Sequence, residues 1–488
     1  MARGRYPETD TSFANMSDQM IESEVSKSPR SSPQGLRIDR KQLILIAFAV
    51  SIFILALVFP FIDFKLQIAL ILAPIALLVV IYILQNPYVG VYLFFLAEYT
   101  RPDYFIPAIR SLRIFILIEI VTLLSWLFHM TKTRKGLIWP KFSWIFVAFL
   151  GVIASTVITA WNNRLAYDIC QSMSIYFMIY LIAINVVDSL KLLNRLIWAL
   201  FIVHFSFAIK GILEGGMAGG AFMGDENDFA LAMNMMIPFA FFMFLGVKSK
   251  IEKLGILLIM VTLTLAIISS MSRGGWVGLI VTIIFCVIRS RRVFAGLFIM
   301  LILTVAIVSF APQKYWAEVE TITDTHEATA ASRINYWKAA VRMFRDYPIT
   351  GVGANNGGIR MPEYYIGPRD SVTEWGRAFH GTLPQILAEL GSLGFICYIL
   401  MIITAIKYLN RMSRRKSNDP DDNSGVLANA IMVSIISYLT TATFLSTPYY
   451  PQLWTLYTLT MILVTVIKAE DSKTVKNGTA MAKEVRRM

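Results

Sequence analysis

Charged residues are scarce in this sequence, and histidine and cysteine are scarcer still. Only 16% of its 488 residues are charged, whereas 56% are hydrophobic, and apolar runs close to 20 residues long recur along the chain. A soluble protein is therefore excluded, and the composition predicts a polytopic helical membrane protein. The three cysteines lack metal-ligand spacing and fall in or beside apolar runs, so we expect small core residues at Cys170, Cys286 and Cys397.

Two further absences narrow the chemistry. Residues 1–40 contain no apolar core, so we expect no cleavable signal and assign insertion to the first membrane helix. The segments expected outside the membrane contain no Asp-x-Asp cluster, so the sequence requires no metal and we expect no cofactor.

The net charge of +13 comes from 45 Lys and Arg against 32 Asp and Glu. These basic residues cluster in short loops beside apolar runs, which is the positive-inside pattern of membrane proteins. We therefore expect membrane lipids as partners and no nucleic acid.

The apolar runs predict an all-α fold, a polytopic membrane helix bundle in one domain. We expect a disordered cytoplasmic tail at 1–42, a transmembrane bundle at 43–467 and a second cytoplasmic tail at 468–488. One large extracytoplasmic loop with amphipathic helices is inserted at 311–382. The predicted helices number about 14, with 12 possible, at about 43–62, 66–84, 87–99, 114–130, 142–160, 171–187, 196–213, 228–246, 254–271, 275–288, 293–311, 383–407, 426–445 and 453–467.

Strict alternation from a cytoplasmic N-terminus places the large loop outside the cytoplasm. It places four basic loops inside, at 132–135, 248–253, 289–292 and 411–416. The assignment depends on the short run at 87–99, because its loss would move all four basic loops to the outside.

Five arginines outside the loop violate the positive-inside rule in this topology. They are Arg101, Arg110, Arg113, Arg164 and Arg273. An anionic ligand at the outer surface would explain them, and snorkelling to lipid phosphates is the alternative.

Within the large loop, residues 333–347 predict a helix with Ser332 as N-cap and Pro348 as its stop. We expect an apolar side facing the bilayer surface at Trp337, Val341 and Phe344, and a cationic stripe at Lys338, Arg342 and Arg345. Arg333 would lie beside the N-terminal amides of this helix, which favour anions.

Two glycine-rich segments flank possible sites. Gly351–Gly358 lacks a preceding strand and a following Gly-Lys-Ser/Thr, so a mobile turn is favoured over a phosphate loop. The other glycine-rich turn, Glu214–Gly220, leads to Gly224–Asp228 at the start of a helix, where it could contact substrate, although capping is favoured.

His380 is the histidine best placed for chemistry, because it stands at the outer mouth of a predicted membrane helix among arginines. A neutral imidazole is a natural general base near neutral pH, although a lone histidine is more often structural.

These residues together resemble the O-antigen ligase and polymerase superfamily over about residues 215–400. The resemblance rests on the order of four motifs: Gly224–Ala230, Ser272–Trp276, Ser332–Trp337 with Asp346–Gly353, and His380 followed by Leu387–Gly391 and Gly394. It implies a metal-independent glycosyltransferase of the bacterial inner membrane. Such enzymes transfer a glycan from undecaprenyl diphosphate, at the periplasmic face, to lipid A-core or to another glycan.

The resemblance also implies residue roles. The family's loop histidine falls on His380, and its two arginines at the outer helix turn and at the loop helix fall on Arg273 and Arg333. Further diphosphate ligands are candidates only, namely Arg342, Arg377 and Arg110. Gly381 and Pro384 depart from the family's commonest histidine context.

The chemistry of the residues favours the same reaction. Displacing a lipid diphosphate requires a base for the acceptor hydroxyl and cations for the leaving group, and a single base favours inversion. A ligase-like glycosyltransferase is our first hypothesis, and an O-antigen or exopolysaccharide polymerase is the alternative. The rival from another class is a transporter or flippase of polysaccharide precursors, which usually has inverted repeats that this sequence does not show clearly.

Overall fold

The computed structural model describes residues 63–134, 136–219, 222–290, 293–310, 313, 316, 328–366, 374–415 and 422–485. The predicted tail at 1–42, the first apolar run and most of 311–327, including His326, lie outside these residues. Two compact units meet inside the first described helix, one ending at Leu77 and the other beginning at Leu78. The described part of the first unit is the start of that helix, and the account below concerns the second.

Every described segment is helix, turn or irregular, with no strand among these residues, so the all-α prediction is confirmed for them. Each apolar run predicted after the first forms a helix, and these helices are α2 (Phe64–Gln85), α3 (Pro87–Thr100), α5 (Ile114–Thr133), α6 (Lys141–Thr159), α7 (Asn163–Val186), α8 (Leu190–Leu213), α9 (Glu226–Gly246), α10 (Lys250–Ser269), α11 (Arg273–Arg289), α12 (Val293–Phe310), α16 (Thr382–Ser413), α17 (Ser424–Ala442) and α18 (Pro451–Val485). The remaining elements are α4 (Pro102–Phe105), the 3-10 helix η2 (Pro107–Leu112), α14 (Ala328–Asp346) and α15 (Gly357–Tyr364).

Nine helices in the described ranges are long and apolar enough to cross a membrane, namely α5 to α10 and α16 to α18. Shorter apolar stretches lie in α2, at Ala73–Gln85, and in α12, at Gly296–Ser309. The 14-residue α3 is about 21 Å long, shorter than the roughly 30 Å hydrocarbon core. The count of fourteen spanning helices stays a prediction.

Helix α9 is the centre of the bundle. Its residues from Phe229 to Met243 are all buried, and it packs against α17, α10 and α11. Helix α16 packs against both α17 and α6 and so connects helices from the two ends of the sequence. A helix that is apolar on all sides suits this central position, because no face of it meets solvent or lipid.

The connections predicted to share one side of the membrane meet at one end of the bundle. The turn before α7 is joined to the glycine-rich turn by Asn162 N–H donating to Asn356 Oδ1 at 2.7 Å. The first turn of α9 is joined to the turn before α11 by the Ser272 hydroxyl donating to Asn227 Oδ1 at 2.7 Å. We call this the loop end; which side of the membrane it faces stays a prediction.

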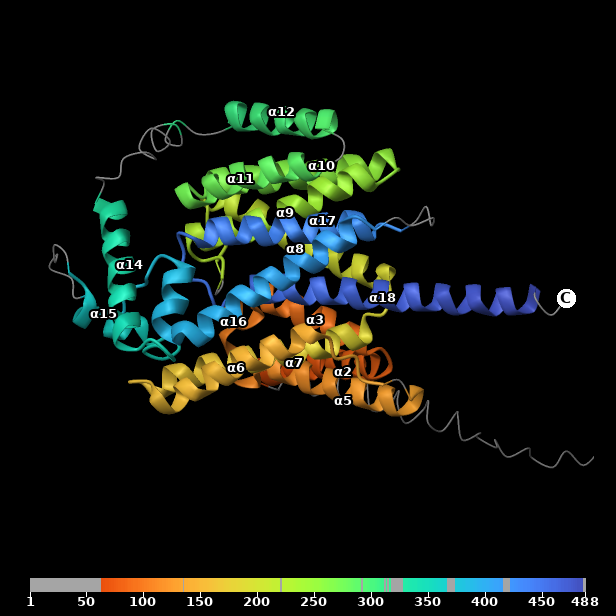
Figure 1. Cartoon of the computed structure of the whole chain (residues 1–488), viewed down its shortest axis with the longest axis horizontal. Helices are drawn as coiled ribbons and strands as arrows, with labels where there is room; N and C mark the ends of the chain where they lie inside the picture. Colours follow the sequence, from red (N-terminus) through yellow and green to blue (C-terminus); the bar gives the residue numbers. More distant parts are fainter. Residues whose placement is uncertain are drawn as a thin grey trace, which may run out of the picture. The chain divides into compact units, whose positions relative to one another are not determined.

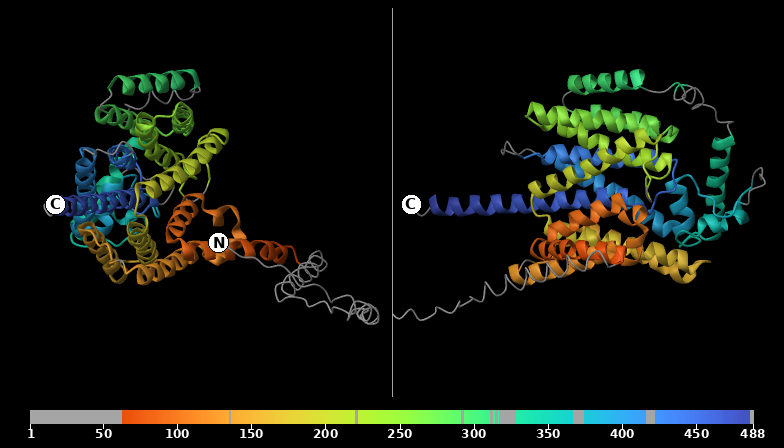
Figure 2. Two further views of the ribbon diagram at one scale, coloured as in Figure 1. Left: turned by 90° about the vertical axis from the view of Figure 1, so that its right-hand side faces the viewer. Right: turned by 180° about the vertical axis from the view of Figure 1, so that it is seen from behind.

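Helix α14 runs across the bundle helices at the loop end (Figure 1; Figure 2, right). It begins at Ala328, so Ser332 lies in its second turn and the prediction of an N-cap there is wrong. The residues Ala328-Thr-Ala-Ala331 extend the helix because alanine has the highest helix propensity. Arg333 consequently lies one turn away from the N-terminal amides that were expected beside it.

Helix α14 has a face buried against protein that the sequence did not predict. Tyr336, Ala339, Ala340 and Met343 are buried, whereas Val341 is 42% exposed. They form a small core with α15 and the start of α16, separate from the core of the bundle. Two adjacent alanines allow this close approach, and a hydrophobicity count cannot detect it because alanine adds little apolar area. The expected apolar side is partly exposed, and its contact with the bilayer stays a prediction.

Helix α16 is two helices joined by a break at Gly391, whose φ of 60° and ψ of −159° are not helical. The bend is visible in Figure 1. The loop backbone replaces the missing helical hydrogen bonds, because Val352 N–H donates to Ala388 O at 2.9 Å and Ser392 N–H donates to Pro348 O at 2.8 Å. Glycine is required here, since a Cβ on Gly391 would lie 2.4 Å from the Ile349 carbonyl oxygen.

Candidate active site

His380 is held at the loop end by both of its backbone polar groups. Its N–H donates to Ser446 Oγ at 3.0 Å, and its carbonyl accepts from Trp337 Nε1 at 3.2 Å. The backbone is left-handed, with φ of 50°, a conformation that a non-glycine residue adopts only at a cost. These two bonds hold the backbone of His380, whose imidazole lies 6.0 Å from the Tyr336 ring, between centroids.

The charges around His380 favour its neutral form. Burial lowers the pKa of His380, Arg333 and Arg377 lower it further, and Asp225 acts in the opposite direction. These residues come from α14, the segment before α16 and the N-cap of α9. The tertiary structure thus brings three distant sequence motifs within electrostatic range of one imidazole.

Arg273 is the first residue of α11 and lies at the same end. The preceding Ser272 is the N-cap, and its Oγ accepts from Gly275 N–H at 3.0 Å. The following Gly274 faces the connection that holds His380, since a Cβ there would lie 3.3 Å from the Phe444 side chain. His380 and the residue after Arg273 therefore lie against the connection between α17 and α18, and Arg333 lies within electrostatic range of His380.

The other three candidate arginines are divided between locations. Arg377 is exposed and acts on His380 electrostatically. Arg342 lies nine residues beyond Arg333, about 13.5 Å along α14, and its Nη1 donates to the Tyr364 carbonyl at 2.8 Å. Arg110 lines a different cavity, formed by residues of α3, η2, α5 and α7.

The chain was compared with known protein families. Residues 258–399 match the family model described as O-antigen ligase. The match supports the O-antigen ligase superfamily for this stretch. It contains Arg273, Arg333 and His380, while the motif Gly224–Asp228 lies before it. A search of the curated proteins found no match.

The glycine-rich turn of the O-antigen ligase domain binds an internal carboxylate. Glu389 is 1% exposed, and its two oxygens accept from Asn355 N–H at 3.0 Å and Gly357 N–H at 3.3 Å. In a phosphate loop, these backbone amides would donate to a phosphate. Here they donate to Glu389, so the structure also argues against a phosphate loop. The turn is also buried against α16, which argues against the mobile turn favoured from the sequence.

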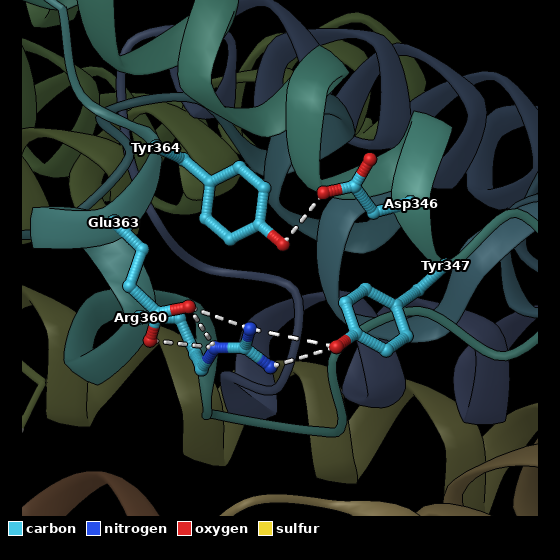
Figure 3. A network of polar contacts seen from close by, with 5 residues as sticks. All are labelled: Asp346, Tyr347, Arg360, Glu363 and Tyr364. Atoms are coloured by element: carbon cyan, nitrogen blue, oxygen red, sulfur yellow. Dashed lines mark hydrogen bonds and ion pairs between the residues drawn. The ribbon is translucent and has the colours of Figure 1, made fainter.

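Arg360, which was not predicted from the sequence, lies among contacts that join α15 to the end of α14. Its guanidinium forms an ion pair with Glu363 at 2.6 Å, and Tyr364 donates to Asp346 at 2.9 Å beside it (Figure 3). Aromatic rings surround Arg360, with Tyr347 5.2 Å from its guanidinium carbon. This arginine is engaged within the fold and lies among structural partners.

The connection 443–450 was also missed, although it organises the site. The Thr382 hydroxyl donates to Leu445 O at 2.8 Å, and Tyr449 donates to Glu389 Oε2 at 2.8 Å. Tyr450 donates to Asp228 Oδ2 at 3.1 Å. In the sequence, the connection 443–450 appears only as a short polar stretch with a proline between two apolar runs. Many loops share that pattern.

Both departures from the family's histidine context have a structural explanation. Gly381 lies against the Trp337 indole, because a Cβ there would be 2.6 Å from Trp337 Nε1. Pro384 is the third residue of α16, where the missing N–H has no intrahelical acceptor to bond. The first turn of α16 is therefore helical despite its proline.

Asp225 caps α9, as favoured from the sequence, and its Oδ1 accepts from Asn227 N–H at 2.8 Å and Asp228 N–H at 3.4 Å. Within the ranges that the structure describes, no group of three or more His, Cys, Asp or Glu side chains could hold a metal ion. Independence from metals stays a prediction.

We expect Glu389→Gln to destabilise the O-antigen ligase domain. The two carboxylate oxygens accept from four donors, which also include the Gln385 amide at 3.2 Å and the Tyr449 hydroxyl. A glutamine would present an NH2 group to one pair of these donors, at a cost of about 1–3 kcal/mol for each buried donor left without an acceptor. Thermal unfolding and limited proteolysis of the purified protein would measure the change.

The matched control is Glu252→Gln, which removes an exposed carboxylate from the first turn of α10. A Glu389→Gln protein as stable and protease-resistant as this control would contradict the role assigned to Glu389.

Proposed function

We propose that this protein is an O-antigen ligase-like glycosyltransferase. It transfers a glycan from undecaprenyl diphosphate to an acceptor hydroxyl, with inversion and without a metal. The superfamily of residues 258–399 supports a membrane enzyme of glycosyltransferase type. The alternative within the superfamily is a polymerase, whose acceptor is another lipid-linked glycan instead of lipid A-core.

In the proposed step, His380 removes the proton from the acceptor hydroxyl. The hydroxyl oxygen attacks the anomeric carbon, and the bond from that carbon to the diphosphate oxygen breaks. Undecaprenyl diphosphate leaves with the electron pair, and Arg273 and Arg333 stabilise its developing charge. Guanidinium groups suit this role because they are planar, always charged and able to donate two parallel hydrogen bonds.

The observation that carries the proposal is the clamped His380 among cations. A base must be neutral to accept a proton, and burial together with Arg333 favours the neutral imidazole. Arg333 would also attract the diphosphate. It would therefore support both the removal of the acceptor proton and the departure of the leaving group.

An apolar groove of about 430 Å³ supports a lipid-carried donor. It lies between α16 and α17 and is lined by Leu383, Pro384, Ile399 and Leu439. Trp337, whose indole donates to the His380 carbonyl, also lines the groove. A polyprenyl chain in this groove would deliver its diphosphate next to the base.

The proposed location is the bacterial inner membrane, with the loop end facing the periplasm. The basic segments at the opposite end support this orientation, including Arg289, Arg411 and Arg415. Arg289 is engaged there with Asn429 Oδ1 at 3.0 Å and Ser413 Oγ at 2.7 Å.

Product analysis tests the function. The purified protein in a lipid bilayer, given undecaprenyl-diphosphate-linked glycan and lipid A-core, should form a covalent glycan–acceptor product. Relocation of intact donor without a new glycosidic bond would indicate a transporter instead. In cells, deletion of the gene should leave full-length unattached polymer if the enzyme is a ligase, and single repeat units if it is a polymerase.

The pH dependence of transfer should report on His380. Because its pKa is lowered from the usual value of about 6.5 and the base acts as neutral imidazole, kcat/KM should rise with pH and level off, with a midpoint below 6.5. Arg377→Gln removes an exposed cation that lowers this pKa, so it should move the midpoint to higher pH.

The control for this shift is Arg345→Gln, at an exposed position of α14. A midpoint that does not differ between Arg377→Gln and this control would contradict the electrostatic assignment.

A further inference from the structure

A second cavity lies beside the first residues after α3, outside the matched O-antigen ligase stretch. Its volume is about 340 Å³, and its polar lining includes Glu98, Arg101, Asp103, Arg110, Arg113 and Tyr176. Three arginines against two carboxylates make this lining cationic. All three arginines belong to the group that violates the positive-inside rule in the predicted topology.

The two carboxylates have partners within the cavity wall. Glu98 accepts from the Tyr176 hydroxyl at 2.7 Å, and Asp103 accepts from Arg101 Nε and Nη2, each at 3.1 Å. Arg101 also lies over the Phe115 ring, 4.9 Å from its centroid. Arg101 is therefore held in place by its neighbours and acts as part of the wall.

Arg110 and Arg113 are different. Among the described residues, neither guanidinium forms a hydrogen bond or an ion pair, and both residues are exposed. Arg110 contributes to lowering the pKa of Asp103, after the hydrogen bond from Arg101, so its charge reaches into the cavity. The φ of 46° at Arg113 is a left-handed conformation, which is more common at functional positions than elsewhere. These two cations are available for an anionic ligand.

The cavity also has an apolar wall, which includes Phe115, Ile116 and Ile175. Arg113 directly precedes α5, a candidate membrane span whose Leu117 and Leu124 are 51% and 55% exposed. Cations at the end of an exposed apolar helix lie where lipid phosphates lie. The combination fits a phosphate group attached to a lipid.

The cavity is connected to the candidate active site. Phe222 lines it and contacts the Tyr450 ring, with centroids 5.3 Å apart. Tyr450 in turn donates to Asp228 in the first turn of α9, three residues after the Asp225 that acts on His380. The start of α9 thus has contacts or electrostatic interactions with both sites.

We propose that this cavity binds a phosphate group of the lipid-linked acceptor, through Arg110 and Arg113. The proposal rests on the proposed function, in which Arg273 and Arg333 already hold the donor diphosphate and a second lipid must approach His380. Lipid A-core and a lipid-linked glycan both carry phosphate, so the site serves either acceptor.

The test compares a phosphorylated acceptor with its dephosphorylated form. Transfer by the full-length protein in phosphatidylcholine nanodiscs is measured with lipid A-core before and after removal of its phosphates. In the unsubstituted protein, dephosphorylation should raise the KM for acceptor by roughly tenfold, the loss of a charge-assisted contact. In Arg110→Gln/Arg113→Gln the KM should be raised already, and dephosphorylation should add little. The KM for donor and kcat should stay within about twofold.

Arg110→Lys/Arg113→Lys should recover part of the affinity, because it restores the charge without the planar fork. A matched control is Lys338→Gln/Arg345→Gln, which removes two exposed cations from α14.

Three results would overturn the proposal. The glutamine variant could raise the KM equally for both acceptor forms, or raise the KM for donor instead. The unsubstituted protein could also fail to distinguish the phosphorylated from the dephosphorylated acceptor.

Failure of the proposed function is distinguishable from these results. If no transfer occurs at all, binding of lipid A-core to His380→Asn protein, measured by native mass spectrometry, still compares the two acceptor forms with and without the Arg110 and Arg113 substitutions. Loss of phosphate discrimination on substitution supports the site, and unchanged binding overturns it.

Discussion

Replacing His380 with asparagine should lower kcat for glycan transfer by roughly 100- to 10,000-fold, the usual contribution of a general base. Asparagine removes the titratable imidazole and tolerates the left-handed backbone, where φ is 50°. The two clamping bonds use the His380 backbone, so they should survive the substitution. The measurement is single-turnover transfer with saturating donor and acceptor.

The matched control is His129→Gln, on α5 and far from the loop in the sequence. Thermal unfolding of both variants shows whether the fold is retained. A folded His380→Asn protein with full transfer would contradict the proposed mechanism. If the variant loses both its fold and its activity, the pH profile of Arg377→Gln tests the role of His380 instead.

Arg273→Gln and Arg333→Gln should each reduce kcat/KM by roughly 30- to 1000-fold, which corresponds to about 2–4 kcal/mol of transition-state stabilisation. Arg273 carries its positive charge at the N-terminus of α11, where the helix dipole disfavours a cation. Its position is therefore poor for helix stability and good for binding an anion. We expect the melting temperature of Arg273→Gln to change far less than its activity.

Lysine at either position keeps the charge but loses the planar pair of donors, so an intermediate loss is expected. Arg345→Gln is the matched control for Arg333, since it removes an exposed arginine from the same helix. Equal activity of Arg333→Gln and Arg345→Gln would show that Arg333 does not hold the diphosphate.

The candidate site could be predicted only in part. His380, Arg273 and Arg333 were found because a conspicuous residue type stood at a helix end or loop helix, and the order of motifs resembled the superfamily. Glu389 looked like part of a helix entering the membrane, although its carboxylate holds the glycine-rich turn. Three of its four hydrogen-bond donors, on Asn355, Gly357 and Tyr449, are more than 30 residues away, and no local pattern encodes such contacts.

Arg110 shows how little charge and predicted sidedness say about a ligand. By these two properties alone it was equivalent to Arg273, and it was predicted only as a further candidate for the diphosphate. In the structure it lines a cavity of its own, beside Arg113. Two cations on one side of a membrane can serve different ligands, and only their neighbours distinguish them.

By itself, the sequence determined the helices of the bundle, because apolar runs of membrane length have few other stable conformations in lipid. It also determined the ends of the bundle at which its basic residues concentrate. The tertiary structure decided which face of α14 is buried, where α16 breaks and which side chains surround His380. These features depend on contacts between segments far apart in the chain. The small side chains of Ala339 and Ala340 allow α14 to pack closely, and Gly391 allows the loop backbone to approach α16.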